Sequence, residues 1–500
     1  MKQEKRRAGK PTSAKPQRAA CEIRNGELLR YHGGEEFTVP DTITAIAAGA
    51  FRDCRTLVSV VIGKNVTAIR RDAFRDCVNL KQVTLPAGLL EIGDSAFRGC
   101  ASLVSLNLPR SVKTVGDSAF RDCKSLKTVN LTTGLTHLGA YAFAGCEAME
   151  NLTLPDTLHS LHKGVFLMCS SLRTVEIPES VDTIGSYVFG ECYSLEEITL
   201  TDAVSYLGRG AFAECRALKH FRAPRRLTFF ANYLFCGCES LEDVTVSDSV
   251  SAIGSYAFCG CKSLRRIAIP QSVTRVGRAS FLGCSSLVRI DLPDGIRALE
   301  RAAFAQCTSL STVHLGNVER IGEECFSKCL ALSEIVLPES VKVIEDKAFY
   351  RCISLELVGL PESLSSIGER AFEECAIVSL SLPESVTRVG DYAFASCYWL
   401  TTFLFPRHRV SLGASVFAGC AGLEVLVLPR RGMRRLRRRE LLHIPGDTQI
   451  IYHNELELSW LLTELGSDGV SDDRRRELCN EIRRLAKSLR HPAEVDAEEG

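Results

Sequence analysis

The sequence repeats itself with a fixed period. A phenylalanine followed three residues later by a cysteine occurs seventeen times in register, from Phe51 and Cys54 to Phe417 and Cys420. Every step between successive phenylalanines is 23 residues, except two steps of 22 residues. A unit this short cannot bury its own apolar face, so stacked neighbours must bury a continuous core. The period therefore predicts a solenoid that grows by adding coils.

Each unit follows the pattern A-F-x-x-C-x-x-L-x-x-V-x-L-P-x-x-V-x-x-I-G-x-x. In the second coil Leu80, Val83 and Leu85 end in the alternation of a strand, and Pro86 ends it because proline has no N–H for a ladder. The piece Phe74 to Cys77 has helical spacing but the length of one turn, which predicts a short α or 3₁₀ turn. We expect a right-handed α/β-type horseshoe, with short parallel strands on the concave face and these turns outside.

The unit resembles the BspA-type (Treponema pallidum-type) leucine-rich repeat, whose units carry the same A-F-x-x-C-x-x-L, L-P and I-G elements. The resemblance covers residues 21–429, and the opening from Ile23 to Pro40 is similar to the N-terminal cap hairpin of bacterial members. It implies a protein-binding or adhesive solenoid, since several relatives are surface proteins that bind host or partner surfaces.

The period also predicts the division of the chain. We expect a disordered basic tail (1–20), a cap hairpin with a partial repeat (21–50), seventeen repeats (51–429), an Arg-rich segment (430–443), a two-helix C-terminal cap (444–491) and a disordered tail (492–500). Within the cap, Ile444 to Tyr452 is a candidate last strand. Asn454 with Glu457 resembles a capping box that opens the first helix. The stacked core should consist of ladders of like residues, with small buried thiols among them.

The four cysteines of two adjacent coils leave alternatives open. Cys236 and Cys259 follow the repeat phenylalanine in adjacent coils, in the sequence F-C-G-C twice, at a position that we expect to be exposed. Stacking would bring them within disulfide reach. They are either accidental neighbours or a redox pair. With Cys238 and Cys261 they are also weak candidates for a four-thiolate metal site.

The strands predict a binding face, because the third and fifth residues of L-x-x-V-x-L point away from the core. These residues become charged in the middle coils, and the candidate partner-binding residues are Glu176, Glu197, His220, Arg222, Asp243, Arg266, Arg289, Asp291, His314 and Glu334. In the late coils they become apolar, at Val336, Leu357, Leu404, Val425 and Val427. An open apolar patch favours either a partner or a C-terminal cap that folds over it.

The strongest charge feature lies after the repeats. Residues 430–443 carry seven Arg and one Glu, whereas 21–429 carry 40 bases and 45 acids. The candidate anion-binding residues are Arg430, Arg431, Arg434, Arg435, Arg437, Arg438 and Arg439. Nucleic acid, an anionic membrane and the acidic segment that follows are the alternative partners. No aromatic reading module accompanies the arginines, which disfavours nucleic acid.

The motifs point away from catalysis. The sequence has no P-loop, H-E-x-x-H or G-x-S-x-G, and no set of residues combines a nucleophile with a base. We expect a monomeric, non-enzymatic scaffold without cofactors that binds a protein ligand, with a surface adhesin or a nucleic-acid-associated protein as alternatives. The first 20 residues lack the apolar segment of a signal peptide, which favours the cytoplasm over secretion or the cell surface. No apolar stretch is long enough for a transmembrane helix.

Overall fold

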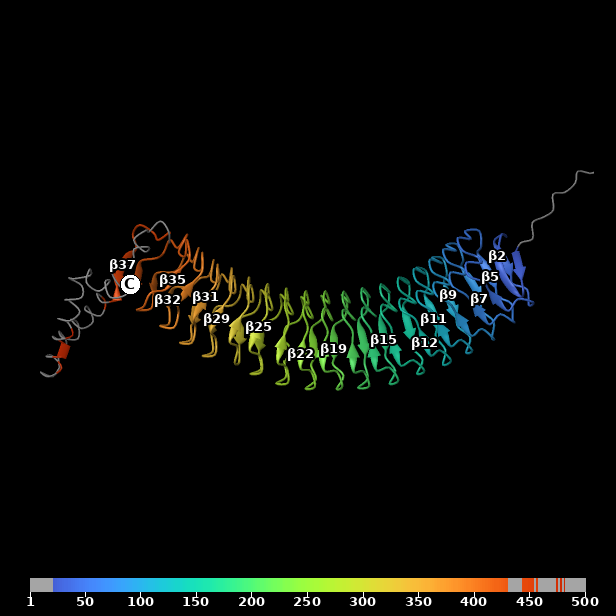
Figure 1. The fold of residues 1–500 in the computed structure, drawn as a ribbon, viewed down its shortest axis with the longest axis horizontal. Coiled ribbons are helices and arrows are strands. Elements are labelled where there is room, and N and C mark those ends of the chain that lie inside the picture. Colours follow the sequence, from blue (N-terminus) through green and yellow to red (C-terminus); the bar gives the residue numbers. More distant parts are fainter. Residues whose placement is uncertain are drawn as a thin grey trace, which may run out of the picture. The chain divides into compact units, whose positions relative to one another are not determined.

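The computed structural model describes residues 21–429 and 443–453, together with the single positions 456, 474, 477, 478 and 481. The chain divides into two compact units, Met1–Leu158 and His159–Gly500, and each is described by itself. In both units the chain winds through stacked coils that are tied together by parallel strands (Figure 1). The described residues form a repeat solenoid with almost no helix.

The predicted strand is present in almost every coil, as a row of short strands. In the first unit its members are β3 (Glu36–Thr38), β5 (Ser59–Val61), β7 (Gln82–Thr84), β9 (Ser105–Asn107), β11 (Thr128–Asn130) and β13 (Asn151–Thr153). In the second unit they are β15 (Thr174–Glu176), β17 (Glu197–Thr199), β19 (His220–Arg222), β21 (Asp243–Thr245), β24 (Arg289–Asp291), β26 (Thr312–His314), β28 (Glu334–Val336), β30 (Leu357–Gly359), β32 (Ser379–Ser381), β34 (Thr402–Leu404), β36 (Val425–Leu428) and β37 (Gln449–Tyr452). The middle residue of a typical member is buried and its two neighbours are exposed, as the alternation requires.

A second row of strands was not predicted and runs through the V-x-x-I-G part of the unit. In the first unit it comprises β4 (Ala45–Ile46), β6 (Ala68–Ile69), β8 (Glu91–Ile92), β10 (Thr114–Val115) and β12 (His137–Leu138), preceded by the antiparallel hairpin β1 (Cys21–Arg24) and β2 (Glu27–Tyr31). In the second unit it comprises β14 (Ser160–Leu161), β16 (Thr183–Ile184), β18 (Tyr206–Leu207), β20 (Phe229–Phe230), β22 (Ala252–Ile253), β23 (Arg275–Val276), β25 (Ala298–Leu299), β27 (Arg320–Ile321), β29 (Val343–Ile344), β31 (Ser366–Ile367), β33 (Arg388–Val389) and β35 (Ser411–Leu412). These two-residue strands pair in parallel with their equivalents one coil away.

The expected α or 3₁₀ turns are absent from the described coils, which corrects that prediction. In the second coil the N–H groups of Asp72, Phe74 and Asp76 donate to carbonyls of the next coil at 2.6–2.9 Å. Only the residues between them donate to carbonyls three residues earlier. Asp72 and Asp76 have φ of 55° and 58°, in the left-handed region. A 3₁₀ helix needs consecutive i→i+3 bonds and negative φ, so this segment is a series of single turns.

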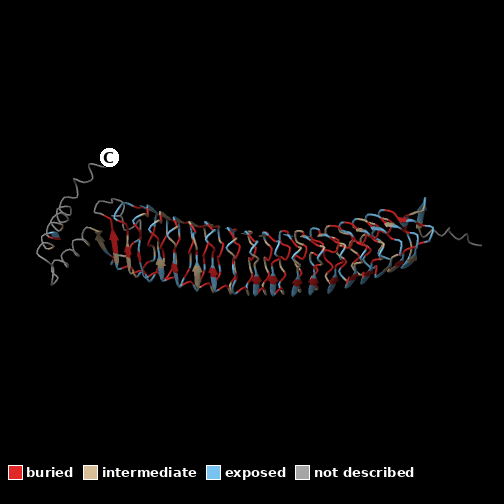
Figure 2. Cartoon of the chain, turned by 90° about the horizontal axis from the view of Figure 1, so that it is seen from below, coloured by how far each residue is buried: buried red, intermediate tan, exposed pale blue. Residues whose placement is uncertain are grey.

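The core consists of the predicted ladders of identical side chains. The ring of Phe74 stacks on that of Phe97 at 4.9 Å, and in the second unit Phe281 stacks on Phe258 and Phe304 at 5.2 Å each. All these rings are fully buried. Figure 2 shows, within each unit, the buried residues along the inside of the coils and the exposed ones along their outer surfaces.

The C-terminal end of the repeats is described only in part. Strand β37 lies inside the expected last strand and pairs in parallel with β36, from Val425↔Gln449 to Leu428↔Tyr452. The helices expected after Asn454 lie almost entirely outside the described residues. Of that segment only single positions, such as the helical Leu478, are described. A helical cap is therefore not shown. The basic tail 1–20 and the tail 492–500 also lie outside the described residues.

Candidate functional site

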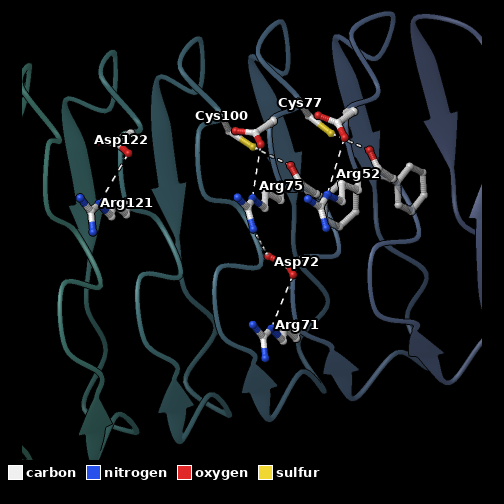
Figure 3. Close-up of polar contacts among 12 residues, drawn as sticks. Arg52, Arg71, Asp72, Arg75, Cys77, Cys100, Arg121 and Asp122 are labelled. Atoms are coloured by element: carbon white, nitrogen blue, oxygen red, sulfur yellow. Dashed lines mark hydrogen bonds and ion pairs between the residues drawn. The ribbon is translucent and has the colours of Figure 1, made fainter.

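The repeat cysteines form a hydrogen-bonded ladder through the core. The thiol of Cys77 donates to the carbonyl of Phe51 at 3.0 Å, and Cys100 donates to Phe74 at 3.2 Å (Figure 3). The same bond recurs along the second unit, for example from Cys284 to Phe258 at 3.1 Å. Sequence reasoning treated these thiols as apolar. It missed the carbonyl acceptor, because the pattern does not show where a backbone oxygen points.

Burial governs the chemistry of this ladder. It raises the pKa of the Cys307 and Cys352 thiols to about 12. The hydrogen bond with the backbone lowers the pKa, but by less than burial raises it. Reactive cysteines carry a lowered pKa and some exposure. The buried ladder thiols are therefore unreactive and act as packing groups that donate one weak hydrogen bond each.

The structure divides the four F-C-G-C cysteines into two kinds. Cys238 and Cys261 are fully buried members of the ladder, and their thiols donate to Phe212 and Phe235 at 3.1 and 3.2 Å. Cys236 and Cys259 are half-buried, and the N–H of Gly237 donates to the carbonyl of Cys259 at 2.7 Å, so the two cysteines lie side by side in adjacent coils. The pair is thus brought together, while the other two thiols are committed elsewhere. Among the described residues, no three His, Cys, Asp or Glu side chains are grouped so as to hold a metal ion.

The ten candidate partner-binding residues all lie on the row of three-residue strands in the second unit, or at its one interruption. Each has an exposed side chain. Arg266 lies at the interruption, since this row has no strand between β21 and β24, which corrects the prediction of a strand in that coil. The alternation nevertheless continues there, with Ile267 and Ile269 buried. The burial of the inward side chains therefore continues in this coil, although its backbone forms no strand pairing.

Three of these residues form one charged cluster across two paired strands. Asp291 on β24 lies opposite His314 on β26. Its carboxylate accepts a hydrogen bond from Nε of Arg289 at 2.7 Å, and its other oxygen lies 2.6 Å from Nδ1 of His314. The bond from Arg289, and to a smaller extent that with His314, holds the pKa of Asp291 below its ordinary value. The cluster fixes the geometry of three exposed polar side chains.

An apolar patch lies on the next strands of the same row. Val336 on β28 is 77% exposed and Leu357 on β30 is 64% exposed. The two strands pair, and Gly359 lies opposite Val336, so no side chain of β30 covers the valine. The later outward residues differ, since Val427 is buried and Leu404 and Val425 are half-buried. The apolar stretch seen in the sequence is thus open only at its beginning.

The first unit has a hollow of mixed charge over its two-residue strands. It is lined by residues that include Arg70, Glu91, Asp94, Asp117 and His137. The carboxylate of Asp94 accepts from the N–H of Asp117 at 2.9 Å, and Asp117 accepts from Ala140 at 2.7 Å. Both acids therefore satisfy the backbone of the following coil, which is a structural role.

The seven candidate anion-binding arginines, Arg430 to Arg439, lie outside the described residues. Within the part of the chain that is described, no helix has the length and apolar character needed to cross a bilayer.

The chain is similar to solved structures of other leucine-rich repeat proteins. A leucine-rich repeat protein from Bacteroides ovatus is 26% identical, with a TM-score of 0.52 over 86% of this chain and 96% of that chain. A leucine-rich cell surface protein from Faecalibacterium prausnitzii is 21% identical, with a TM-score of 0.40 over 79% and 96%. The Treponema pallidum leucine-rich repeat protein is 26% identical, with a TM-score of 0.21 over 48% and 82%. No curated protein matches the chain.

The repeat itself matches a family model, described as the BspA-type leucine-rich repeat region in six copies. The matched segments are 29–149, 115–242, 228–335 and 319–437, so together they span most of the chain. The predicted resemblance is confirmed. The family has a non-enzymatic scaffold kind of fold that is typical of protein interaction, and no catalytic family is indicated. This protein belongs to the BspA-type leucine-rich repeat family.

Proposed function

We propose that this protein is a non-enzymatic scaffold that binds a protein ligand on the outward side chains of its three-residue strands in the second unit. The observation that carries the proposal is the adjacency of a fixed charged cluster and an open apolar patch on one strand row. We call this set the binding face, defined by Arg289, Asp291, His314, Glu334, Val336 and Leu357.

The strand order places these residues next to one another. Strand β24 pairs with β26, β26 contacts β28, and β28 pairs with β30. Neighbouring strands lie roughly 4.8 Å apart, so the row spans about 14 Å across its three gaps. A small apolar centre beside polar, solvent-accessible residues is the usual anatomy of a protein interface.

Rigidity supports the same conclusion. The ring ladder and the backbone ladders hold the strands beneath the binding face, and Ile290 and Ile335, the middle residues of β24 and β28, are buried. A preformed surface loses little conformational entropy when it binds, so more of the contact energy appears as affinity. The remaining candidates, Glu176, Glu197, His220, Arg222, Asp243 and Arg266, extend the proposed surface toward β15.

A photo-crosslinking amino acid at Leu357 tests the proposal in cells that express the protein. We expect a crosslinked protein adduct from position 357. The matched control is Val61, an outward valine at the third position of β5 in the first unit, 43% exposed, and it should give no such adduct. Equal adducts from both positions, or none from 357, would contradict the proposal.

Once a partner is trapped, affinity measurements test the individual residues. Leu357→Asp should weaken binding at least about tenfold, because it places a charge in the apolar centre of the interface. Arg289→Glu should also weaken binding, since it breaks the bond to Asp291 and reverses the local charge. Val61→Asp is the control for a new carboxylate on an outward position. An affinity unchanged by reversal of both Arg266 and Arg289 would remove the charged residues from the proposed surface.

A further inference from the structure

The half-buried thiols of Cys236 and Cys259 have the placement that a disulfide needs. They occupy the same position in adjacent coils, directly after Phe235 and Phe258. The N–H of Gly237 donates to the carbonyl of Cys259 at 2.7 Å, which locks the two backbones side by side. Equivalent atoms of hydrogen-bonded strands are roughly 4.8 Å apart, and disulfides need Cα separations of about 4.4–6.8 Å.

The surroundings leave this pair accessible and separate. Each thiol is followed by a glycine with positive φ, Gly237 at 78° and Gly260 at 74°. Most other coils carry a side chain such as Asp or Glu at this position, whereas here the two glycines add none, and the Glu214 carboxylate of the preceding coil lies over Gly237. The equivalent residues of the two flanking coils are Ala213 and Leu282, so the ladder of thiols at this position has two members only.

The proximity of the two thiols distinguishes them chemically. The interaction between them lowers the pKa of Cys259 and raises that of Cys236. The thiolate is the nucleophile in thiol–disulfide exchange. Cys259 is therefore the attacking residue of the pair, and Cys236 is the resolving residue.

We propose that Cys236 and Cys259 form a reversible intramolecular disulfide by exchange with a low-molecular-weight disulfide, RSSR, of the glutathione type. The Cys259 thiolate attacks one sulfur of RSSR, which forms a mixed disulfide at Cys259 and releases one RS⁻. The Cys236 sulfur then attacks the Cys259 sulfur, and the mixed bond breaks to release the second RS⁻. The two thiol protons are taken up by the two RS⁻ groups. The protein loses two electrons, and RSSR is reduced to two RSH.

The sequence provides a direct test with the full-length protein. Trypsin cleaves after Arg226 and Lys262, and the peptide 227–262 contains four cysteines. The reduced protein is incubated with oxidised glutathione, alkylated in denaturant without reductant and digested for mass spectrometry. We expect peptide 227–262 to carry two alkyl groups after oxidation and four before it, with the linkage between Cys236 and Cys259 and no retained glutathione. Reductant should restore all four sites.

Single serine variants establish the order of the two steps. Cys236→Ser should stop at a glutathione adduct on Cys259, because no resolving thiol is present. Cys259→Ser should form its adduct on Cys236 more slowly, and urea unfolding of both reduced variants checks that they fold like the wild type. Half-buried Cys54 is the internal control, and it should give at most a mixed disulfide. Four alkyl groups after oxidation, a stable glutathione adduct on the wild type, or a link that includes Cys238 or Cys261 would overturn the proposal.

Discussion

Raising the pH from 7 to 10 is expected to unfold the repeats in a steep transition. The buried ladder thiols keep their protons in the folded state, where burial raises the pKa of Cys307 and Cys352 to about 12 from an ordinary 9.0. In the unfolded chain the same thiols ionise near their ordinary pKa. Above that pH the unfolded state binds fewer protons, so the free energy of unfolding falls as the pH rises.

The expected effect is large because a buried thiol with a raised pKa recurs in most coils of the second unit. Each buried thiol costs about 1.4 kcal/mol of unfolding free energy per pH unit, from the unfolded-state pKa up to the folded-state pKa. Between about pH 9 and 10 about ten such thiols together lose roughly 14 kcal/mol, which matches the upper end of the roughly 5–15 kcal/mol that stabilises a folded domain. Below pH 8 both states hold the protons, and stability should be nearly independent of these groups. Urea midpoints followed by circular dichroism between pH 7 and 10 measure the slope.

A triple variant separates the thiols from the other groups that titrate at high pH. Cys284→Ala, Cys307→Ala and Cys352→Ala together should lower stability at pH 7 through lost packing, yet reduce the loss between pH 8 and 10. Three fewer protons should be released on unfolding. A wild-type stability that is level from pH 8 to 10, or an unchanged slope in the triple variant, would show that the ladder does not control alkaline unfolding.

Phe281→Ala is expected to be the most damaging single substitution in the middle of the second unit. The ring of Phe281 is fully buried and is stacked between Phe258 and Phe304, with interplanar angles of 8° and 6°. Its removal leaves a cavity between two coils, and such substitutions cost about 3–5 kcal/mol. Because each coil contacts only its neighbours, the loss should break the cooperativity of the solenoid at this point.

Urea unfolding and hydrogen exchange test this second expectation together. Exchange should accelerate most in the coils around residues 258–304 and less with distance along the repeat. Phe229→Ala is the matched control, since Phe229 on β20 is only half-buried and the same atoms are removed. Equal losses for the two variants would mean that the ring ladder contributes no more than a surface phenylalanine.

Much of the fold could be predicted from particular residues. The spacing of Phe51, Phe74 and their successors required stacking in register, and the alternation Leu80-x-x-Val83-x-Leu85 required a strand with two outward residues. The exposure of the outward side chains from Glu176 to Glu334 follows from that alternation. The candidate face could thus be located by sequence, although its binding role is a proposal.

Other features depend on contacts that spacing does not encode. The two-residue strands escaped prediction because a run such as Glu91–Ile92 is too short for a periodic signal. The prediction of an α or 3₁₀ turn at Phe74 was wrong because Asp72 and Asp76 take positive φ. The residue type alone does not indicate this backbone conformation, since aspartate adopts negative φ in most positions. The cluster of Arg289 with Asp291 and His314 required the pairing of two strands at known register.

The sequence by itself therefore determined which residues lie in the same layer of every coil, because a period of 23 residues aligns like with like. Only the tertiary structure decided what these residues do to one another. It aimed the ladder thiols at the carbonyls of the preceding coil, placed Cys236 beside Cys259, and left Val336 and Leu357 uncovered. The physical reason is that periodicity specifies position along the stack, whereas the direction of a hydrogen bond or a side chain depends on backbone angles and neighbouring atoms.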